Sequence, residues 1–302
     1  MKRVVSISLG SSKRNKRVNA TLFGEEFEIE RVGTDGDKAK YRQLIADLDG
    51  KVDAFGVGGT DLYVYANNRR YTMRDSVTLF KAAKKTPYVD GSGLKNTLER
   101  ETVAYLQEKG IVDFTQKRVL LVCAVDRFGM AEALAQRAKS IVFGDMMFSL
   151  GIPIAIRSWG AVQRLARLVL PVVVQCPIEW LYPTGEKQDK NTPKWQKYYA
   201  EADVIAGDYH LIGRYMPEDL KGKIVLTNTT TAENVEELKR RGVHLLITTT
   251  PVFEGRSFGT NVMEAVLVTL LNKPPDQLTP EDYFRKLQEL DWKPTVQELN
   301  PL

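Results

Sequence analysis

The first third of the chain alternates hydrophobic and polar residues in short segments that are separated by turns. Val4 to Leu9, Arg17 to Leu22 and Phe27 to Val32 are rich in β-branched residues with a period of two, which predicts strands. Between Asp37 and Leu48 the apolar residues recur at helical spacing. Ala54 to Val57 is a further short strand that ends in two glycines. These elements predict a small mixed α/β domain.

From Arg118 onward the hydrophobic pattern changes from alternation to continuous runs. Arg118 to Ala124 is a continuous hydrophobic run, as is typical of a strand buried on both faces. Similar runs are Ser140 to Gly144, Val172 to Gln175, Val204 to Ala206, Ile224 to Leu226 and Leu245 to Thr248. Helical patterns lie among them at Gly129 to Ala138, Ala161 to Leu168, Ala232 to Arg241 and Thr260 to Leu271. Strands that alternate with helices predict a Rossmann-like, doubly wound parallel sheet.

These patterns divide the chain into three parts. We predict an N-terminal substrate or catalytic domain over residues 1–117 and a Rossmann-like nucleotide-binding domain over residues 118–273. Residues 274–302 form a C-terminal helix and tail. The helix is predicted over Pro280 to Leu290, because Thr279 suits an N-cap and two acidic residues follow in the first turn. We expect this tail to fold back on the first domain.

Composition narrows the classes of function. With 43% hydrophobic and 27% charged residues, the 302-residue chain is not disordered, and a net charge of +5 is too small to argue for nucleic acid. Two cysteines and two histidines exclude a disulfide framework and a three-histidine or four-cysteine metal centre, so we expect no metal. The chain has neither a signal-like start nor an 18-residue apolar run. We therefore expect a cytoplasmic protein with a small-molecule substrate and no membrane partner, and a homodimer stays open.

The end of the first buried run is the first candidate binding site, because ligands of doubly wound sheets bind outside the carboxyl ends of the strands. The segment after the run opens a helix where a dinucleotide-binding domain carries its glycine-rich turn. Asp126 lies in this turn, and a carboxylate about 4 Å from a phosphate would cost about 4 kcal/mol at an effective dielectric of ~20 unless its side chain points away. Arg127 compensates and is itself able to bind a phosphate. We predict cofactor contacts from Ala124, Asp126, Arg127, Phe128 and Gly129.

Asp145 ends the second run, 19 residues after Asp126. An acidic residue about 20 residues beyond the turn holds a ribose hydroxyl in NAD sites and repels the 2′-phosphate of NADP. The alternative is that Asp145 caps a helix that starts at Met146. The two roles are compatible with each other.

The later strand ends are rich in small polar residues. Gly207 permits close approach of the backbone, and the hydroxyl and amide groups of Asn228, Thr229 and Thr249 suit a ribose and a nicotinamide. Alternatively, these residues cap the helices that follow, as Thr231 is expected to do. Because such ends converge at one edge of a parallel sheet, we predict a ligand cleft there.

Two further segments carry candidate chemistry. Lys95 follows a glycine-rich turn, and a nearby aspartate, Asp61 or Asp90, is able to tune its pKa for general acid–base work. A solvated lysine at a helix start is the alternative. Arg256 lies in a glycine-containing loop before an apolar helix, where it is placed to grip a carboxylate or phosphate. A surface hinge is the alternative for this loop.

The segments Val5 to Lys13, Asp90 to Arg100 and Asp126 to Ala131, together with the order of the domains, resemble bacterial members of the quinate/shikimate dehydrogenase family. The resemblance implies NAD(P)-dependent oxidation of a cyclitol carboxylate, with a lysine–aspartate pair that handles the hydroxyl proton and with Ser11 and Ser12 on the substrate carboxylate. The family's Asn-x-Thr-x-Pro-x-Lys motif is absent. The resemblance therefore supports the architecture more than the substrate.

These observations predict an α/β protein that acts as an NAD(P)-dependent oxidoreductase, a dehydrogenase of a small hydroxylated carboxylic acid such as quinate or shikimate. NAD is the expected cofactor, with NADP as the alternative. Two other functions stay open. One is a Rossmann-like transferase that uses S-adenosylmethionine, a cofactor without a pyrophosphate. The other is a non-catalytic metabolite-binding protein in which Lys95 is an ordinary surface residue.

Overall fold

The computed structural model describes the chain except residues 68, 178–190, 251 and 254–255, and it leaves the side chains of 252, 253, 256 and 257 undescribed. The chain forms two compact units. The first unit comprises residues 1–95, 168–188 and 259–291, and the second comprises 96–167, 189–258 and 292–302. Both contain a largely parallel sheet with helices, so the predicted α/β fold class is confirmed.

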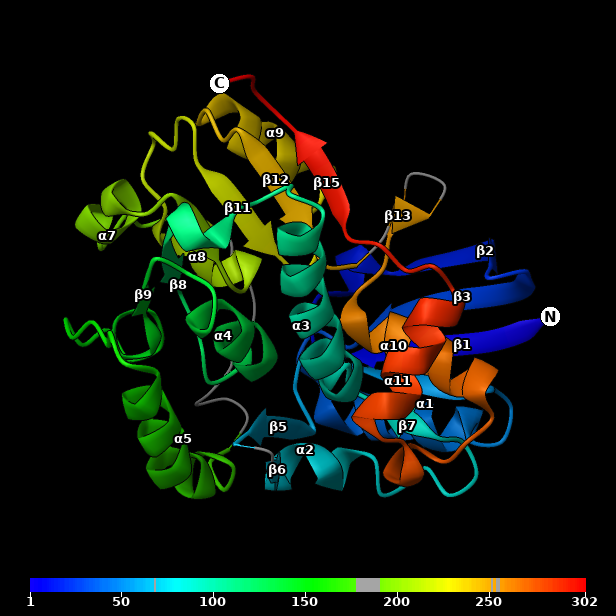
Figure 1. The fold of residues 1–302 in the computed structure, drawn as a ribbon. Coiled ribbons are helices and arrows are strands. Elements are labelled where there is room, and N and C mark those ends of the chain that lie inside the picture. The colour runs from blue at the N-terminus through cyan, green and yellow to red at the C-terminus, as the bar shows by residue number, and fades with distance from the viewer. Residues whose placement is uncertain (68, 178–190, 251, 254–255) are drawn as a thin grey trace. The chain divides into compact units, whose positions relative to one another are not determined.

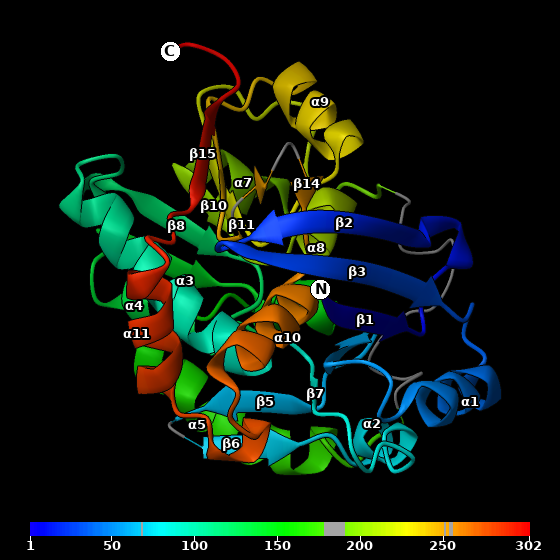
Figure 2. The ribbon, with the colours of Figure 1, turned by 90° about the vertical axis from the view of Figure 1, so that its right-hand side faces the viewer.

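The first unit contains a five-stranded sheet in the order β2-β3-β1-β4-β7 (Figures 1 and 2). Its strands are β1 (Lys2–Ser8), β2 (Lys16–Leu22), β3 (Glu25–Gly33), β4 (Ala54–Gly58) and β7 (Tyr88–Val89), and β5 (Tyr63–Ala66) and β6 (Arg69–Thr72) form a separate hairpin. Its helices are α1 (Lys38–Leu48), α2 (Arg74–Leu79), α10 (Thr260–Leu271) and α11 (Pro280–Glu289), with 3-10 turns at Ser12–Arg14 and Pro275–Gln277. Within the five-stranded sheet, β2 pairs with β3 in the antiparallel direction and the other pairings are parallel.

The alternation along β1 explains how the two faces of this sheet are covered. Val5 and Ile7 join the buried cluster that contains the side chains of α1 and α2. Ser6 points to the opposite face, where the Asn261 side chain of α10 donates a hydrogen bond to its hydroxyl at 2.9 Å. Gly56, the neighbour of Ser6 on β4, has no room for a side chain because the Asn261 carbonyl lies 3.1 Å from a Cβ built there. Small residues therefore let α10 approach the sheet closely.

The second unit contains a six-stranded sheet in the order β15-β12-β11-β10-β8-β9. Its strands are β8 (Arg118–Leu121), β9 (Ser140–Phe143), β10 (Val204–Ala206), β11 (Ile224–Thr227), β12 (Leu245–Thr248) and the antiparallel edge strand β15 (Thr295–Glu298), with a short pair β13 (Val252–Phe253) and β14 (Arg256–Ser257). Its helices are α4 (Phe128–Ala135), α7 (Gln196–Glu201), α8 (Tyr209–Tyr215) and α9 (Ala232–Arg240), with short turns at Phe114–Gln116 and Asp145–Ser149. Two helices belong to both units, α3 (Ser92–Glu108) and α5 (Trp159–Val173).

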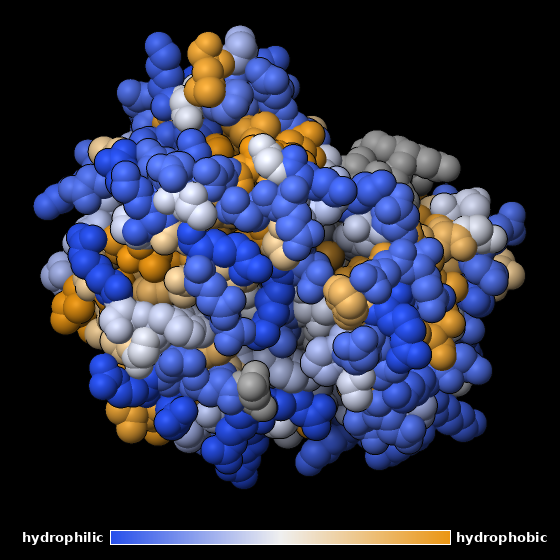
Figure 3. Space-filling view, in the orientation of Figure 1, coloured by the Kyte–Doolittle hydropathy of each residue, from blue (hydrophilic) through white to orange (hydrophobic). Residues whose placement is uncertain are grey.

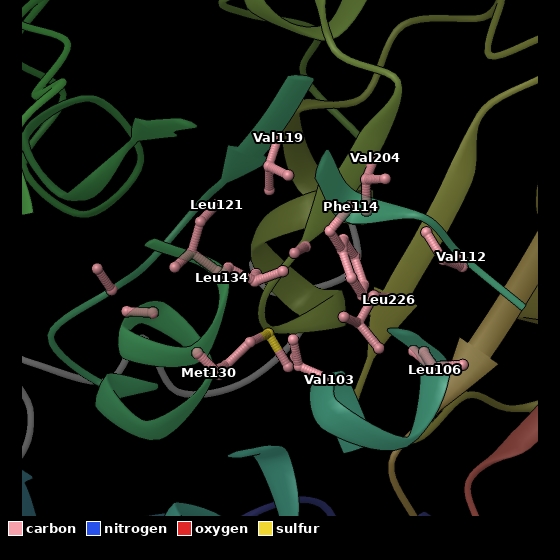
Figure 4. Close-up of a cluster of buried hydrophobic side chains, with 14 of the residues drawn as sticks. Val103, Leu106, Val112, Phe114, Val119, Leu121, Met130, Leu134, Val204 and Leu226 are labelled. Carbon is pink, nitrogen blue, oxygen red and sulfur yellow. The ribbon is translucent and has the colours of Figure 1, made fainter. Parts of the chain in front are cut away.

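The core of the second unit lies on both faces of its sheet. On one face, Leu121 packs in a cluster with Val103 of α3 and Leu134 of α4 (Figure 4). Val162 of α5 belongs to the same cluster. On the other face, Leu120 packs in the cluster that holds the side chains of α7, α8 and α9. Helices thus cover both faces of the sheet. Because successive residues of a strand point to opposite faces, every residue of these strands meets a helix, which explains the continuous hydrophobic runs.

Two predicted elements and two features of the predicted domain organisation differ from the structure. Val172 to Gln175 does not form a strand, because α5 continues through Pro171 to Val173. The first buried strand ends at Leu121 rather than at Ala124. The boundary between the units lies at Lys95 rather than at residue 117, and α10 belongs to the first unit rather than to the Rossmann-like part. Both differences in domain organisation arise from packing between segments that are distant in sequence.

Candidate functional site

The carboxyl edge of the second sheet brings together several residues that the sequence singles out. Because β8, β10, β11 and β12 are parallel neighbours, their ends lie side by side. Arg127 follows β8, Asp208 follows β10 and Asn228 follows β11, and the Asp208 carboxylate accepts hydrogen bonds from Arg127 at 2.7 Å and from Asn228 at 3.3 Å. The predicted convergence is therefore present, but these side chains bind one another.

Asp145 has a different role from either prediction. Its side chain is 6% exposed, and one carboxylate oxygen accepts the backbone N–H groups of Ala124 at 3.0 Å and Val125 at 2.8 Å. These are the donors that a pyrophosphate at this turn would need. The short helix that begins at Asp145 receives no side-chain cap. Asp145 thus closes the preceding turn with its carboxylate and does not cap its own helix, and the ribose contact stays a prediction.

Burial raises the pKa of Asp145, and the negative charge of Asp126 acts in the same direction. The hydrogen bonds from Ala124 and Val125 act against this rise. Among the described residues, none hydrogen-bonds to the second, buried oxygen, Oδ2. One oxygen of the carboxyl group thus serves the turn and the other does not.

Arg127 is buried rather than available to a phosphate. Its guanidinium is 3% exposed, pairs with Glu99 of α3 and Asp208, and lies 3.9 Å from the Asp126 carboxylate. Burial alone would lower the pKa of Arg127, but these three carboxylates hold it above its ordinary value. In the structure these carboxylates already neutralise the arginine, and the phosphate contact stays a prediction.

The other predicted cofactor contacts have internal partners too. The Phe128 ring lies 4.7 Å from the ring of Trp159, and a Cβ on Gly129 would lie 2.3 Å from the carbonyl oxygen of Asn96. Gly129 thus allows two helices, α4 and α3, to approach each other. Gly207, at φ +128°, has the Val122 side chain 2.6 Å from a Cβ position. The space beside each of these two glycines is therefore occupied by atoms of the chain itself.

The threonines at the later strand ends lie at the same edge. Thr249 is buried, its N–H donates to the carbonyl of Thr227 at 2.9 Å, and its carbonyl accepts from Trp292. Thr229 is half-buried in the segment before α9. The neighbouring Thr231 caps α9, as predicted, through a capping box with Asn234.

The serines expected to hold a substrate carboxylate lie in the loop after β1. The Ser11 side chain accepts from the N–H of Lys13, and the N–H of Ser12 donates to Asp35 at 2.7 Å. Ser11 and Ser12 therefore shape the loop. Arg256 lies in β14, and its side chain is outside the described residues.

The three residues proposed for proton transfer are all in the first unit. Lys95 lies in the first turn of α3, and Asp61 precedes β5. The Asp90 carboxylate accepts four hydrogen bonds, from the N–H groups of Leu62, Tyr63 and Ser92 and from the Ser92 hydroxyl. Asp90 thus joins the start of α3 to the start of the β5–β6 hairpin.

The first unit also contains a cavity of about 670 Å³. Tyr63 and Tyr65 of β5, Arg70 of β6, Tyr88 of β7, Glu264 of α10 and Tyr283 of α11 line it. The Arg70 guanidinium lies 4.5 Å from the centre of the Tyr63 ring, and register places Arg70 opposite Tyr65. Its volume is that of a site for a small molecule.

Glu264 is the most perturbed acid of this cavity. Its side chain is buried and accepts hydrogen bonds from the N–H of Gly91 at 2.6 Å, the N–H of Leu94 at 3.1 Å and the Tyr283 hydroxyl at 2.6 Å. Burial raises the pKa of Glu264 to about 7, and the nearby Asp90 carboxylate adds to the rise. Gly93 is required here, because a Cβ would lie 2.5 Å from a Glu264 oxygen.

Sequence reasoning missed this cavity, although it holds two signals. Tyr63 and Tyr65 are two apart on a strand and therefore share a face. Glu264 is the one charged residue in the apolar stretch Thr260–Leu271. An isolated acid in an apolar helix marks a buried, hydrogen-bonded carboxyl group.

The residues at the β8 turn do not fit a dinucleotide, because the turn's N–H groups serve Asp145 and its arginine serves buried carboxylates. In the part of the chain that the structure describes, no three His, Cys, Asp or Glu side chains are placed to hold a metal ion. None of the described helices combines the length and the apolar character of a membrane span.

Several solved structures resemble the chain. A galactofuranose binding protein is 11% identical over 96% of this chain and 99% of that chain, with a TM-score of 0.37. A periplasmic solute binding protein of an ABC transporter from Actinobacillus succinogenes 130z, with bound D-allose, is 11% identical over 99% of this chain and 98% of that chain, at 0.35. A hetero-hexameric glutamate dehydrogenase from Thermus thermophilus is 13% identical over 96% of this chain and 72% of that chain, with a TM-score of 0.44. No curated protein matches.

The geometry of the β8 turn corrects the predicted function. Asp145 closes the turn expected to receive the pyrophosphate. The prediction of an oxidoreductase for a quinate-like acid is therefore wrong, whereas the transferase alternative stays a prediction.

Two family models match adjoining parts of the chain. The first, described as "Domain of unknown function (DUF8753)", matches residues 3–90, and the second, "Domain of unknown function (DUF8754)", matches residues 93–299. Since the second covers more than half of the sequence, the chain belongs to the DUF8754 family.

Proposed function

We propose that the chain binds a small, uncharged, hydroxyl-rich molecule, of the monosaccharide class, in the cavity of the first unit and does not convert it. The observation that carries the proposal is the cavity of about 670 Å³ lined by four tyrosines, Tyr63, Tyr65, Tyr88 and Tyr283. Tyrosine combines an apolar ring face with a hydroxyl group. This combination suits a ligand with C–H faces and hydroxyl edges.

The charges of the lining favour a neutral ligand. Four basic residues, Arg70, Lys84, Lys85 and Lys273, face the acidic residues Asp53, Asp90 and Asp276, together with Glu264, whose pKa of about 7 leaves it partly protonated near neutral pH. The lining therefore has little net charge. A strongly anionic or cationic ligand would meet no matching excess of charge, and desolvating its charge would therefore cost free energy. A neutral polyol avoids this cost.

The acids of the cavity support binding rather than turnover. Asp90 accepts four hydrogen bonds and Glu264 accepts three, all from the chain itself. A general acid or base must reach the proton that it transfers. These carboxyl groups instead hold the start of α3 and the β5–β6 hairpin, and so shape the cavity.

The test is calorimetry and thermal shift with purified protein and a panel of neutral monosaccharides, quinate, a sugar phosphate, NAD and S-adenosylmethionine. At about 100 times its dissociation constant a ligand stabilises the folded state by about 2.7 kcal/mol. We expect a neutral monosaccharide to bind and to be recovered unchanged. Tyr65→Phe should weaken binding about tenfold if its hydroxyl hydrogen-bonds to the ligand.

Tyr105→Ala is the matched control, because Tyr105 is half-buried on α3 and is not among the lining residues. Equal affinity of Tyr65→Phe and the parent protein, together with equal affinity of Tyr63→Ala, would place the ligand elsewhere. Preference for NAD or S-adenosylmethionine, or recovery of a chemically altered ligand, would overturn the proposal.

A further inference from the structure

Helix α5 has more apolar surface than the protein covers. Val162, Ala166 and Leu170 are buried at a spacing of four residues. A second apolar stripe, Leu165, Leu168, Val169 and Val172, follows positions i, i+3, i+4 and i+7 on another side of the helix. In this stripe Leu168 is 75% exposed and Val172 is 66% exposed.

The charge of this segment has one sign. Between Asp145 and Glu179 the sequence contains no acidic residue. It contains Arg157, Arg164 and Arg167, and all three are exposed. Arg164 lies about one turn before Leu168, and Arg167 directly precedes Leu168, so positive charge lies along one side of the apolar stripe.

The loop before α5 repeats this character. Leu150, Ile152 and Ile154 are 62%, 38% and 53% exposed, which is unusual for three large apolar residues within five positions. Figure 3 shows hydrophobic side chains at the surface over the region where Figure 1 draws α5, on a face that is otherwise mostly hydrophilic. Apolar patches rimmed by polar residues mark interaction sites.

The charge pattern distinguishes between the partners that fit such a patch. A second copy of the chain, seated on the same patch by a two-fold axis, would bring like-charged arginines together without an acidic residue of the segment to offset them. A bilayer that contains anionic lipid offers both an apolar interior and negative charge. The 15 residues of α5 are too few to span it.

We propose that α5 and the loop that precedes it, the α5 surface (residues 150–172), dock on an anionic lipid surface. Leu168 and Val172 enter the boundary between headgroups and acyl chains, and Arg164 and Arg167 bind lipid phosphates. A helix with an apolar stripe and arginines beside it lies in the plane of the membrane interface. The proposal is independent of ligand binding in the first unit, and it replaces the expectation of no membrane partner.

The test is sedimentation of the full chain with two kinds of vesicle, phosphatidylcholine alone and a mixture in which about a third of the lipid is phosphatidylglycerol. We expect sedimentation with the mixed vesicles at low salt and its loss at high salt. Replacing Arg164 and Arg167 by Gln should lower the partition coefficient about fivefold for each residue. Leu168→Ser should lower it on the order of tenfold.

Ile111→Ser is the control, because Ile111 is an exposed apolar residue outside the α5 surface. Thermal melts of all variants establish that each is folded. Equal sedimentation with both kinds of vesicle, or none with either, would overturn the proposal. So would a dimer in sedimentation equilibrium that Leu168→Ser dissociates, since the patch would then be an interface between copies.

Discussion

Replacing Glu264 by Gln should remove a measurable part of the pH dependence of stability. Glu264 is 2% exposed, and its carboxyl group is enclosed by Gly91, Leu94 and Tyr283. Burial is the main cause that raises its pKa from 4.5 to about 7 in the folded chain. The unfolded chain lacks this environment, so the two states bind protons differently over this range.

The sign and size of the effect of pH on the free energy of unfolding follow from this difference in proton binding. Between pH 4.5 and about 7 the folded chain keeps the proton on Glu264 while the unfolded chain loses it. The free energy of unfolding therefore falls as the pH rises through this window and is unaffected by Glu264 below it. At about 1.4 kcal/mol for each tenfold difference in proton affinity, the loss amounts to about 3 kcal/mol.

The assay is urea unfolding of the parent and of Glu264→Gln at about pH 5 and about pH 8, with linear extrapolation to water. The glutamine loses a hydrogen bond to one backbone N–H at every pH, so the informative quantity is the change between the two pH values. From about pH 5 to about pH 8 we expect the free energy of unfolding of the parent to fall by about 3 kcal/mol more than that of Glu264→Gln. Glu289→Gln, an exposed residue of α11, is the control. Equal pH dependence of parent and Glu264→Gln would refute the reasoning.

Three further predictions concern the second unit, and each is measured by urea unfolding. Asp145→Ala leaves the N–H groups of Ala124 and Val125 without an acceptor and should lower the free energy of unfolding by about 3 kcal/mol, with partial recovery in Asp145→Asn. Equal stability of the parent and both variants would contradict the role of Asp145 in closing the turn. Gly129→Ala should cost about 1–3 kcal/mol, because the added methyl group would lie 2.3 Å from the Asn96 carbonyl oxygen. Arg127→Met isolates buried carboxylates and should cost about 3–5 kcal/mol, most of it recovered at acid pH, where those carboxylates are protonated.

Much of the second sheet could be predicted because each strand carries its own signal. Val204 to Ala206 and Leu245 to Thr248 are short hydrophobic runs with helical patterns on either side, and the structure places strands at both. Val172 to Gln175 has the same local signal but lies in the last turn of α5 and just beyond it. The local pattern does not distinguish these cases, because Pro171 and three valines are tolerated where the helix is already packed through Val162 and Leu170.

The organisation of the first unit depends on contacts that no local pattern records. Asn261 binds Ser6, which is 255 positions away, and Gly91 binds Glu264, which is 173 positions away. From the sequence alone, the apolar helix after residue 259 is assigned to the Rossmann-like sheet, because the strands of that sheet precede it along the chain. The small residues of β1 and β4 instead give it a site in the first unit.

The acid at position 145 shows why the spacing of a motif does not determine its chemistry. Parallel strands β8 and β9 bring Asp145 beside the turn that follows β8, whether or not a nucleotide binds there. From this position a carboxylate has two options, a ribose hydroxyl of a ligand or the N–H groups of the turn. A turn with three glycines leaves room for a pyrophosphate, which satisfies those N–H groups and leaves the acid for the ribose. Here the turn after Cys123 has side chains in place of the glycines, so the nearest anion is the chain's own carboxylate. The missing glycines and the inward turn of Asp145 are thus one feature of this turn.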